Sequence, residues 1–351
     1  MPARRTRTTT VTLLTVALLV LGGAFATSGS DDSGTPFTTA AGATAVETSP
    51  APHAVGVRHF DFARGKDRPL PTMVWYPVRG SARKTHGRAQ VDATPLPGQY
   101  PLLLWSHGFY SNPQMQEGMT KFLAESGYIV AAPAYPYTKK DGRKFDKTDV
   151  PNQAVDASFV ITRMMDADNP LAASIDPERL GAVGHSGGGT TTNWLFTGKR
   201  DPRLKVGVIF AGRPTQAYKG TPVPLLFIHG DKDPVVAYSQ GRESYGKDPW
   251  PKAFLSIEGG EHGAGTNDPE RGHAQVLATL LDFLDFALNG DDVARMRLPS
   301  DATQPGCTHF ESVGLFPGDY PNATNSTSAT TTTAAPTPTQ SKVLDLAGSA
   351  G

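Results

Sequence analysis

Three residue types that can act together in nucleophilic catalysis occur along this chain in the order serine, aspartate, histidine. Ser186 stands in Gly-His-Ser-Gly-Gly at 184–188, which matches G-x-S-x-G. An apolar, strand-like segment precedes this motif and a helix-like segment follows it. A tight turn in that setting lifts the serine hydroxyl clear of the sheet. Ser186 is therefore the predicted nucleophile.

A serine hydroxyl needs a base to activate it, and the base needs a carboxylate to orient it. Asp231 and Asp233 both follow the apolar segment 223–229. We predict Asp233 as the acid, and Asp231 as the rival whose ordinary role is to brace the turn by accepting backbone N–H groups. Among nine histidines, His262 is the predicted base because it lies in a glycine-rich loop just after a strand-like segment. His273 is the alternative, in or near the last predicted helix.

Two backbone amides are predicted to hold the oxyanion that forms during acyl transfer. Gly187 directly follows the nucleophile, and Phe109 ends the loop Ser-His-Gly-Phe at 106–109. The histidines that flank glycine in these loops (His107, His185 and His229) are predicted to pack or to bond the loops.

Alternating strands and helices must position these side chains. Strands are expected at 55–62, 71–76, 101–106, 128–132, 179–184, 205–211, 223–229 and 253–258, and helices at 115–126, 154–165, 187–196 and 274–287. This alternation predicts one α/β domain, 53–317, with a mostly parallel central sheet and helices on both faces. Only 212–221 separates the two strands between which many lipases insert a cap, so we expect no cap domain.

The cleft of such a domain lies beyond the carboxyl ends of its strands. Phe109, Tyr110, Tyr135 and Tyr137 follow strand ends and are predicted to line it. No cluster of Arg or Lys is evident in these loops, which favours an uncharged acyl group.

Composition argues against several other functions. Lys+Arg and Asp+Glu both number 33 and no basic run occurs, so nucleic acid is not an expected partner. Neither H-E-x-x-H nor paired Cys/His spacing occurs, so we expect no metal and no cofactor. Cys307 is the only cysteine, which excludes an intramolecular disulfide. It also lacks the strand-turn-helix setting of a nucleophile.

The two ends of the chain differ from the middle. Residues 1–26 combine arginines, an apolar run at 11–21 and Ala24-Phe25-Ala26, as in an export signal; an uncleaved anchor is the alternative. Residues 27–52 and the Thr/Ser/Pro-rich 318–351 lack core-forming side chains and are expected to be a disordered leader and tail. We therefore expect a secreted or cell-envelope protein, monomeric and without a stable membrane span.

Over about 55–288 the chain carries a series of short motifs: Val57-Arg58, Trp75-Tyr76-Pro77, Ser106-His107-Gly108-Phe109, 127–133, 184–188, 229–233 and 260–263. In these motifs it resembles bacterial α/β-hydrolases grouped with platelet-activating-factor acetylhydrolases. It is similar too to dienelactone hydrolases, chlorophyllases and cutinase-like polyester hydrolases. The resemblance implies the α/β-hydrolase fold and makes the second Asp of His-Gly-x-x-Asp, here Asp233, the acid. Dienelactone hydrolases have a cysteine where this chain has Ser186, and the polyester hydrolases commonly carry an aromatic residue and a methionine where His185 and Gly187 stand.

Together these features predict a secreted serine carboxylic ester hydrolase (EC 3.1.1.-), carboxylesterase-like or lipase-like, with lipid degradation as one role. It would cleave small-molecule or polymeric esters through an acyl-enzyme intermediate. Two alternatives stay open. One is an amidase or peptidase on the same triad, and the other is a non-catalytic surface binding protein on a hydrolase scaffold.

Overall fold

The computed structural model describes residues 52–316 and 319, apart from 83–86, 143 and 268. The predicted export signal lies outside the described residues, as do the predicted leader and tail except for one residue of each. Within the described part, no helix is both long enough and apolar enough to cross a membrane.

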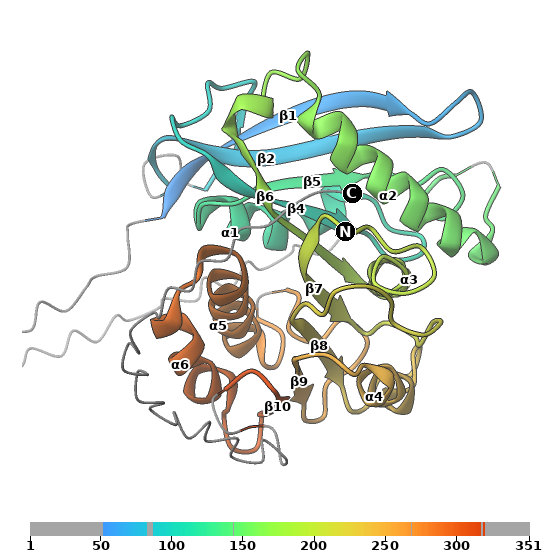
Figure 1. The fold of residues 1–351 in the computed structure, drawn as a ribbon, viewed down its shortest axis with the longest axis vertical. Coiled ribbons are helices and arrows are strands. Elements are labelled where there is room, and N and C mark those ends of the chain that lie inside the picture. Colours follow the sequence, from blue (N-terminus) through green and yellow to red (C-terminus); the bar gives the residue numbers. More distant parts are fainter. Residues whose placement is uncertain (1–51, 83–86, 143, 268, 317–318, 320–351) are drawn as a thin grey trace, which may run out of the picture. The chain divides into compact units, whose positions relative to one another are not determined.

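Ten strands form one sheet in the order β10-β9-β8-β7-β6-β4-β5-β2-β1-β3 (Figure 1). The six strands from β9 to β5 in this order run parallel, whereas β2 and β10 join them antiparallel. The predicted mostly parallel sheet is thus confirmed. The strands are β1 His53–Ala63, β2 Pro69–Ser81, β3 Gln90–Val91, β4 Tyr100–Ser106, β5 Ile129–Pro133, β6 Ile175–His185, β7 Leu204–Phe210, β8 Leu225–Gly230, β9 Lys252–Ile257 and β10 Thr308–Val313.

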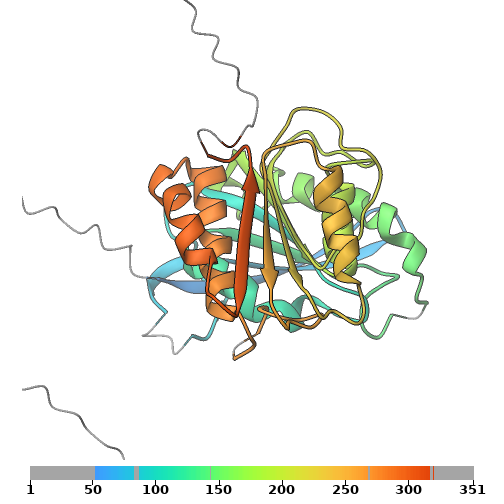
Figure 2. The ribbon, with the colours of Figure 1, turned by 90° about the horizontal axis from the view of Figure 1, so that it is seen from below.

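Helices cover both faces of this sheet, as predicted. Figure 2 shows α5 and α6 on one face and α2 and α4 on the other; the buried clusters place α1 with the first pair and α3 with the second. The helices are α1 Glu117–Glu125, α2 Val150–Met165, α3 Gly187–Trp194, α4 Tyr238–Lys247, α5 His273–Leu284 and α6 Asp292–Ala302, with short 3₁₀ turns at Pro113–Gln116, Lys147–Asp149 and Ala172–Ser174 and a π-helical turn at Asp285–Asn289.

The central strand β4 shows why the sheet holds its strand ends rigidly. Leu102 and Leu104 pack in the core under α2, α3 and α4, while Leu103 and Trp105 pack in the core under α1, α5 and α6. A strand buried on both faces must be apolar at consecutive positions, which is the pattern that predicted it. Loops that leave its end therefore start from a fixed position.

Four elements are absent from the predicted set: β3, α4, α6 and β10. The sequence signal is weak in each case, because α4 is polar and contains Gly241 and Gly246, and α6 contains Pro299. β10 is a short edge strand with a largely half-exposed side-chain pattern. The segment 211–224 between β7 and β8 contains neither helix nor strand.

Candidate active site

The predicted site residues all follow the carboxyl ends of sheet strands. Ser186 follows β6, Asp233 follows β8 and His262 follows β9, while Phe109 follows β4. Because these strands are parallel, their ends meet at one edge of the sheet. The fold therefore brings together side chains that are up to 153 residues apart in the sequence.

Ser186 occupies a strained turn between β6 and α3. Its backbone has φ 58° and ψ −119°, a conformation that non-glycine residues rarely adopt. The flanking glycines make the turn possible: a Cβ on Gly184 would lie 2.3 Å from the Gly188 carbonyl oxygen, and one on Gly188 would lie 1.9 Å from the Ser106 carbonyl oxygen. The sharp turn presents the Ser186 hydroxyl at the sheet edge.

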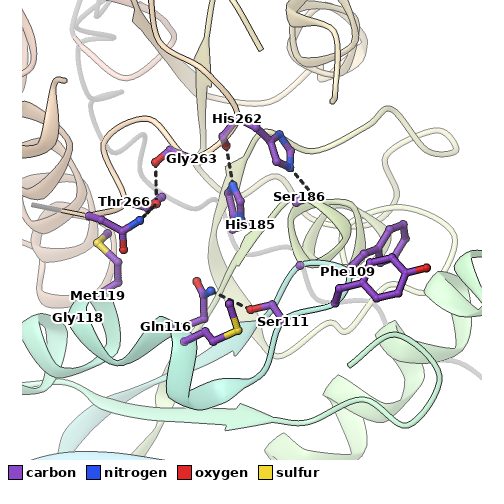
Figure 3. A pocket seen from close by; sticks show the side chains of 14 residues that line it. Phe109, Ser111, Gln116, Gly118, Met119, His185, Ser186, His262, Gly263 and Thr266 are labelled. Carbon is purple, nitrogen blue, oxygen red and sulfur yellow. Dashed lines mark hydrogen bonds between the residues drawn. The ribbon is translucent and has the colours of Figure 1, made fainter. Parts of the chain in front are cut away.

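A continuous hydrogen-bond chain links the three predicted triad residues (Figure 3 shows its Ser186–His262 part). His262 Nε2 lies 2.8 Å from Ser186 Oγ, and His262 Nδ1 lies 2.7 Å from Asp233 Oδ2. When Nδ1 carries the proton and donates it to the carboxylate, Nε2 is left free to accept the serine proton. This geometry allows His262 to act as a general base toward Ser186.

The Asp233 carboxylate is held in its ionised form. Its side chain is fully buried, and burial alone would raise its pKa; the hydrogen bonds from His262 and from the amides of Val236 and Val235 outweigh that effect and lower the pKa. Both amides donate to Oδ1 at 2.8 Å, which leaves Oδ2 for the histidine. His229 Nε2 also lies 3.2 Å from Oδ2.

The two rival residues lie elsewhere. Asp231 Oδ1 accepts the Gly259 amide at 2.7 Å and so ties the β8 loop to the β9 loop. His273 begins α5, and its Nδ1 bonds the Gly265 carbonyl oxygen. Neither forms a hydrogen bond to Ser186 or His262 in the described part of the chain.

Two buried histidines support the site loops. His185 Nε2 donates to the His262 carbonyl oxygen at 2.8 Å. His107 donates from Nδ1 to the Gly108 carbonyl oxygen, and its Nε2 accepts the Tyr135 amide. Burial lowers the pKa of each imidazole to about 4, so both are neutral at pH 7.

Two backbone N–H groups are available for an oxyanion. The Phe109 amide has no acceptor among the described residues, and the Gly187 amide is the first of α3, where no intrahelical acceptor exists. The Phe109 ring lies against Gly187, since a Cβ there would sit 2.5 Å from the ring. Gly108 is also tightly enclosed, though less so, because a Cβ there would lie 3.1 Å from Ser186 Cβ.

Two hollows meet at Ser186, and both include Phe109 in their walls. The first, of about 250 Å³, contains His262 and uncharged side chains from the loop after β4 and from α1 (Figure 3). We call it the histidine-side hollow; its other lining residues are Gly108, Tyr110, Ser111, Met115, Gln116, Gly118, Met119, His185, Gly263, Thr266 and Asn267.

The second hollow, of about 550 Å³, lies on the Gly187 side of Ser186, and we call it the helix-side hollow. Its wall combines Trp194 and valines with two cations, Lys147 and Arg213; the other lining residues are Thr148, Val150, Pro151, Thr190, Val235 and Val236. The sequence shows no cluster of Arg or Lys in the loops of the predicted cleft, and the structure places these two single cations in the wall of this hollow. Lys147 and Arg213 come from segments 66 residues apart, so no local cluster in the sequence could reveal them.

The three tyrosines predicted to line the cleft have different positions. Tyr110 lines the histidine-side hollow, is 62% exposed and stacks on Phe145 with ring centroids 4.2 Å apart. Tyr135 lines neither hollow, because its side chain is fully buried and its hydroxyl forms a hydrogen bond with Ser106 Oγ. Tyr137 lines neither hollow, because its ring lies under Arg68 and its hydroxyl reaches the Asp67 carbonyl oxygen.

Comparison with known proteins bears on the fold. Residues 82–221 match the family model of chlorophyllase. Among solved structures, the ferulic acid esterase from Streptomyces cinnamoneus is similar, with a TM-score of 0.55, 21% sequence identity, and coverage of 70% of this chain and 93% of that one. A search of curated proteins found no match. The fold is that of the α/β-hydrolases.

Proposed function

We propose that this chain, which has the α/β-hydrolase fold, is an exported serine carboxylic ester hydrolase that works as a monomer through an acyl-enzyme. The observation that carries the proposal is the unbroken Asp233–His262–Ser186 hydrogen-bond chain beside two backbone amides that have no acceptor among the described residues. The predicted export signal at 1–26 motivates the location.

In the proposed reaction, His262 Nε2 takes the proton from Ser186 Oγ as the oxygen attacks the ester carbonyl carbon. The carbonyl oxygen becomes an oxyanion, which the Phe109 and Gly187 amides stabilise. His262 then returns the proton to the leaving alkoxy oxygen, and the acyl group stays on Ser186. Water, deprotonated by His262, attacks this acyl-enzyme and releases the acid. Asp233 keeps the imidazole oriented and stabilises its protonated form.

Amide hydrolysis on the same residues is the second candidate, since nothing in the triad geometry separates the two reactions. A non-catalytic binding role is disfavoured, because every member of the triad is present and within hydrogen-bond distance of the next.

The test compares wild type with Ser186→Ala on 4-nitrophenyl esters of increasing chain length and on a matched anilide. We expect ester cleavage by wild type, little cleavage of the anilide, and none of either by the variant. A fluorophosphonate probe should label wild type only. Equal labelling of both proteins, or preferred cleavage of the anilide, would count against the proposal.

A further inference from the structure

We propose that the helix-side hollow selects esters whose acyl group carries its own carboxylate, with Arg213 and Lys147 as the residues that recognise it. This inference rests on the proposed ester hydrolase function and names its substrate class. Both cations line a hollow of about 550 Å³ whose walls include the nucleophile Ser186.

Neither cation is neutralised by an acid within the described part of the chain. Arg213 donates only to neutral acceptors, Gln240 Oε1 at 2.5 Å and the Val235 carbonyl oxygen at 3.1 Å. A guanidinium has five N–H donors, so most of its donors stay free for a ligand. Lys147 forms no ion pair with any described residue.

The acids that flank the lining residues in the sequence already have partners. Asp149 is bound by Arg68 through two hydrogen bonds of 2.7 and 2.9 Å. Asp146 accepts both the amide and the hydroxyl of Thr148, and it does not line the hollow. Asp233 is engaged by His262 and two amides. A carboxylate on a substrate therefore meets two cations that have no competing anion in the wall of the hollow.

The rest of the wall suits the carbon chain of an acyl group. Trp194, Val150 and Val235 are apolar, and Val235 is 58% exposed. An acyl chain that covers these side chains removes apolar surface from water, while its terminal carboxylate reaches the cations. The wall thus matches a half-ester of a dicarboxylic acid, with apolar side chains for its carbon chain and cations for its free carboxylate.

The position of His262 decides which half of the ester enters each hollow. His262 lines the histidine-side hollow and not the helix-side hollow. Because His262 must give a proton to the leaving oxygen, the alcohol half lies on the histidine side. The acyl half, on the other side of the scissile bond, then extends toward Arg213 and Lys147.

The experiment measures kcat/KM for mono(4-nitrophenyl) adipate, which is anionic, and for its neutral methyl ester, and takes the ratio of the two. Each of Arg213→Gln and Lys147→Gln should lower this ratio about fivefold, and the double variant more. Arg213→Lys, which keeps the charge, should restore much of it. Raising the salt concentration should lower the wild-type ratio, because exposed charges are screened.

Two control variants separate charge from structure. Gln240→Leu removes a neutral partner of Arg213 without changing the charge, and it should leave the ratio near that of wild type. Lys199→Gln removes a cation that lines neither hollow, and it should do the same. Adipate should inhibit wild type more strongly than hexanoate, and the double variant should lose this difference.

An unchanged ratio in the double variant, with the neutral ester cleaved in a Ser186-dependent way, would overturn the inference alone. Failure of wild type to cleave even the neutral ester would instead reject the proposed function.

Discussion

His185 donates a hydrogen bond from Nε2 to the carbonyl oxygen of His262, 2.8 Å away, and their rings lie 4.9 Å apart. The residue before the predicted nucleophile thus holds the loop that carries the predicted base. A structural bond of this kind fixes the distance between the two reacting side chains without touching the reacting atoms. His185 is in this sense a positioning residue.

Replacing His185 by Leu should therefore lower kcat roughly ten- to a hundredfold, because a small displacement of the base is costly in an oriented reaction. His185→Gln keeps a side-chain N–H donor and should lose less. Steady-state kinetics on a 4-nitrophenyl ester would measure both, with thermal unfolding as a check on folding. Equal losses in the two variants would show that the hydrogen bond has no part in positioning.

Asp233→Asn should cost about 10⁴-fold in kcat, the size of the loss when a triad aspartate becomes Asn and the imidazole takes the wrong tautomer. Asp231→Asn is the matched control, since its remaining carbonyl oxygen still accepts the Gly259 amide. Its activity should stay within a few-fold of wild type. A larger loss in the Asp231 variant would transfer the role of acid to that residue.

Gly188→Ala should prevent folding or destabilise the protein severely, because the new methyl group would lie 1.9 Å from the Ser106 carbonyl oxygen. Gly246→Ala is the counterpart in open space within α4, and there alanine should stabilise by about 0.5–1 kcal/mol. Urea unfolding of both variants tests this pair. A well-folded Gly188→Ala protein would contradict this prediction, because it would mean that the backbone at residue 188 can move away from Ser106.

The buried carboxyl group of Asp248 makes stability depend on pH. Burial raises its pKa to about 7 from an ordinary value of 3.8, against the effects of the Trp250 amide and Lys252. The folded state therefore binds the proton more tightly than the unfolded state does. The stability that this supplies is fully present below pH 3.8 and is lost as pH rises through 7.

Asp248→Asn removes that dependence, so the variant should gain roughly 2 kcal/mol relative to wild type between pH 5 and pH 8. Urea unfolding at both pH values measures the difference. Asp168→Asn, at a side chain that is 75% exposed, provides the control and should show no such gain. Parallel pH profiles for wild type and Asp248→Asn would contradict the argument.

The rate of ester cleavage should rise smoothly as substrate passes its solubility limit. Interfacial activation needs a lid that moves, and the segment 211–224 contains no helix or strand to form one. An emulsion assay across that limit tests the expectation. An abrupt rise in rate would point to a moving cover formed by another segment.

The sequence predicted the elements with the strongest patterns, and the reason is local. Apolar strands such as β4 and β8 are visible because burial on both faces forbids polar residues. Ser186 could be predicted as the nucleophile because a tight turn requires small residues, here glycines, next to the serine in the sequence. Tyr135 was misplaced because following a strand end says nothing about which way a side chain points, and this one turns into the core.

The helix-side hollow could not be foreseen for a related reason. Lys147 and Arg213 line the same cavity only because four segments that are far apart in the sequence pack around Ser186. Their isolated positions in the sequence carry no periodicity and no motif. Tertiary packing, and not local propensity, creates this part of the site.

Phe109 contributes both to the shape of the substrate hollows and to the stabilisation of the oxyanion. Its amide is one of the two groups available to the oxyanion, and its ring belongs to the walls of both hollows while pressing on Gly187, which supplies the other amide. A smaller side chain at Phe109 would widen a hollow, but it would also remove the ring that packs on Gly187. The Gly187 amide, which is proposed to stabilise the oxyanion, would then be held less firmly. Substrate range and turnover are therefore mechanically coupled here, and attempts to broaden the first should begin at residues that touch only one hollow, such as Met115 or Trp194.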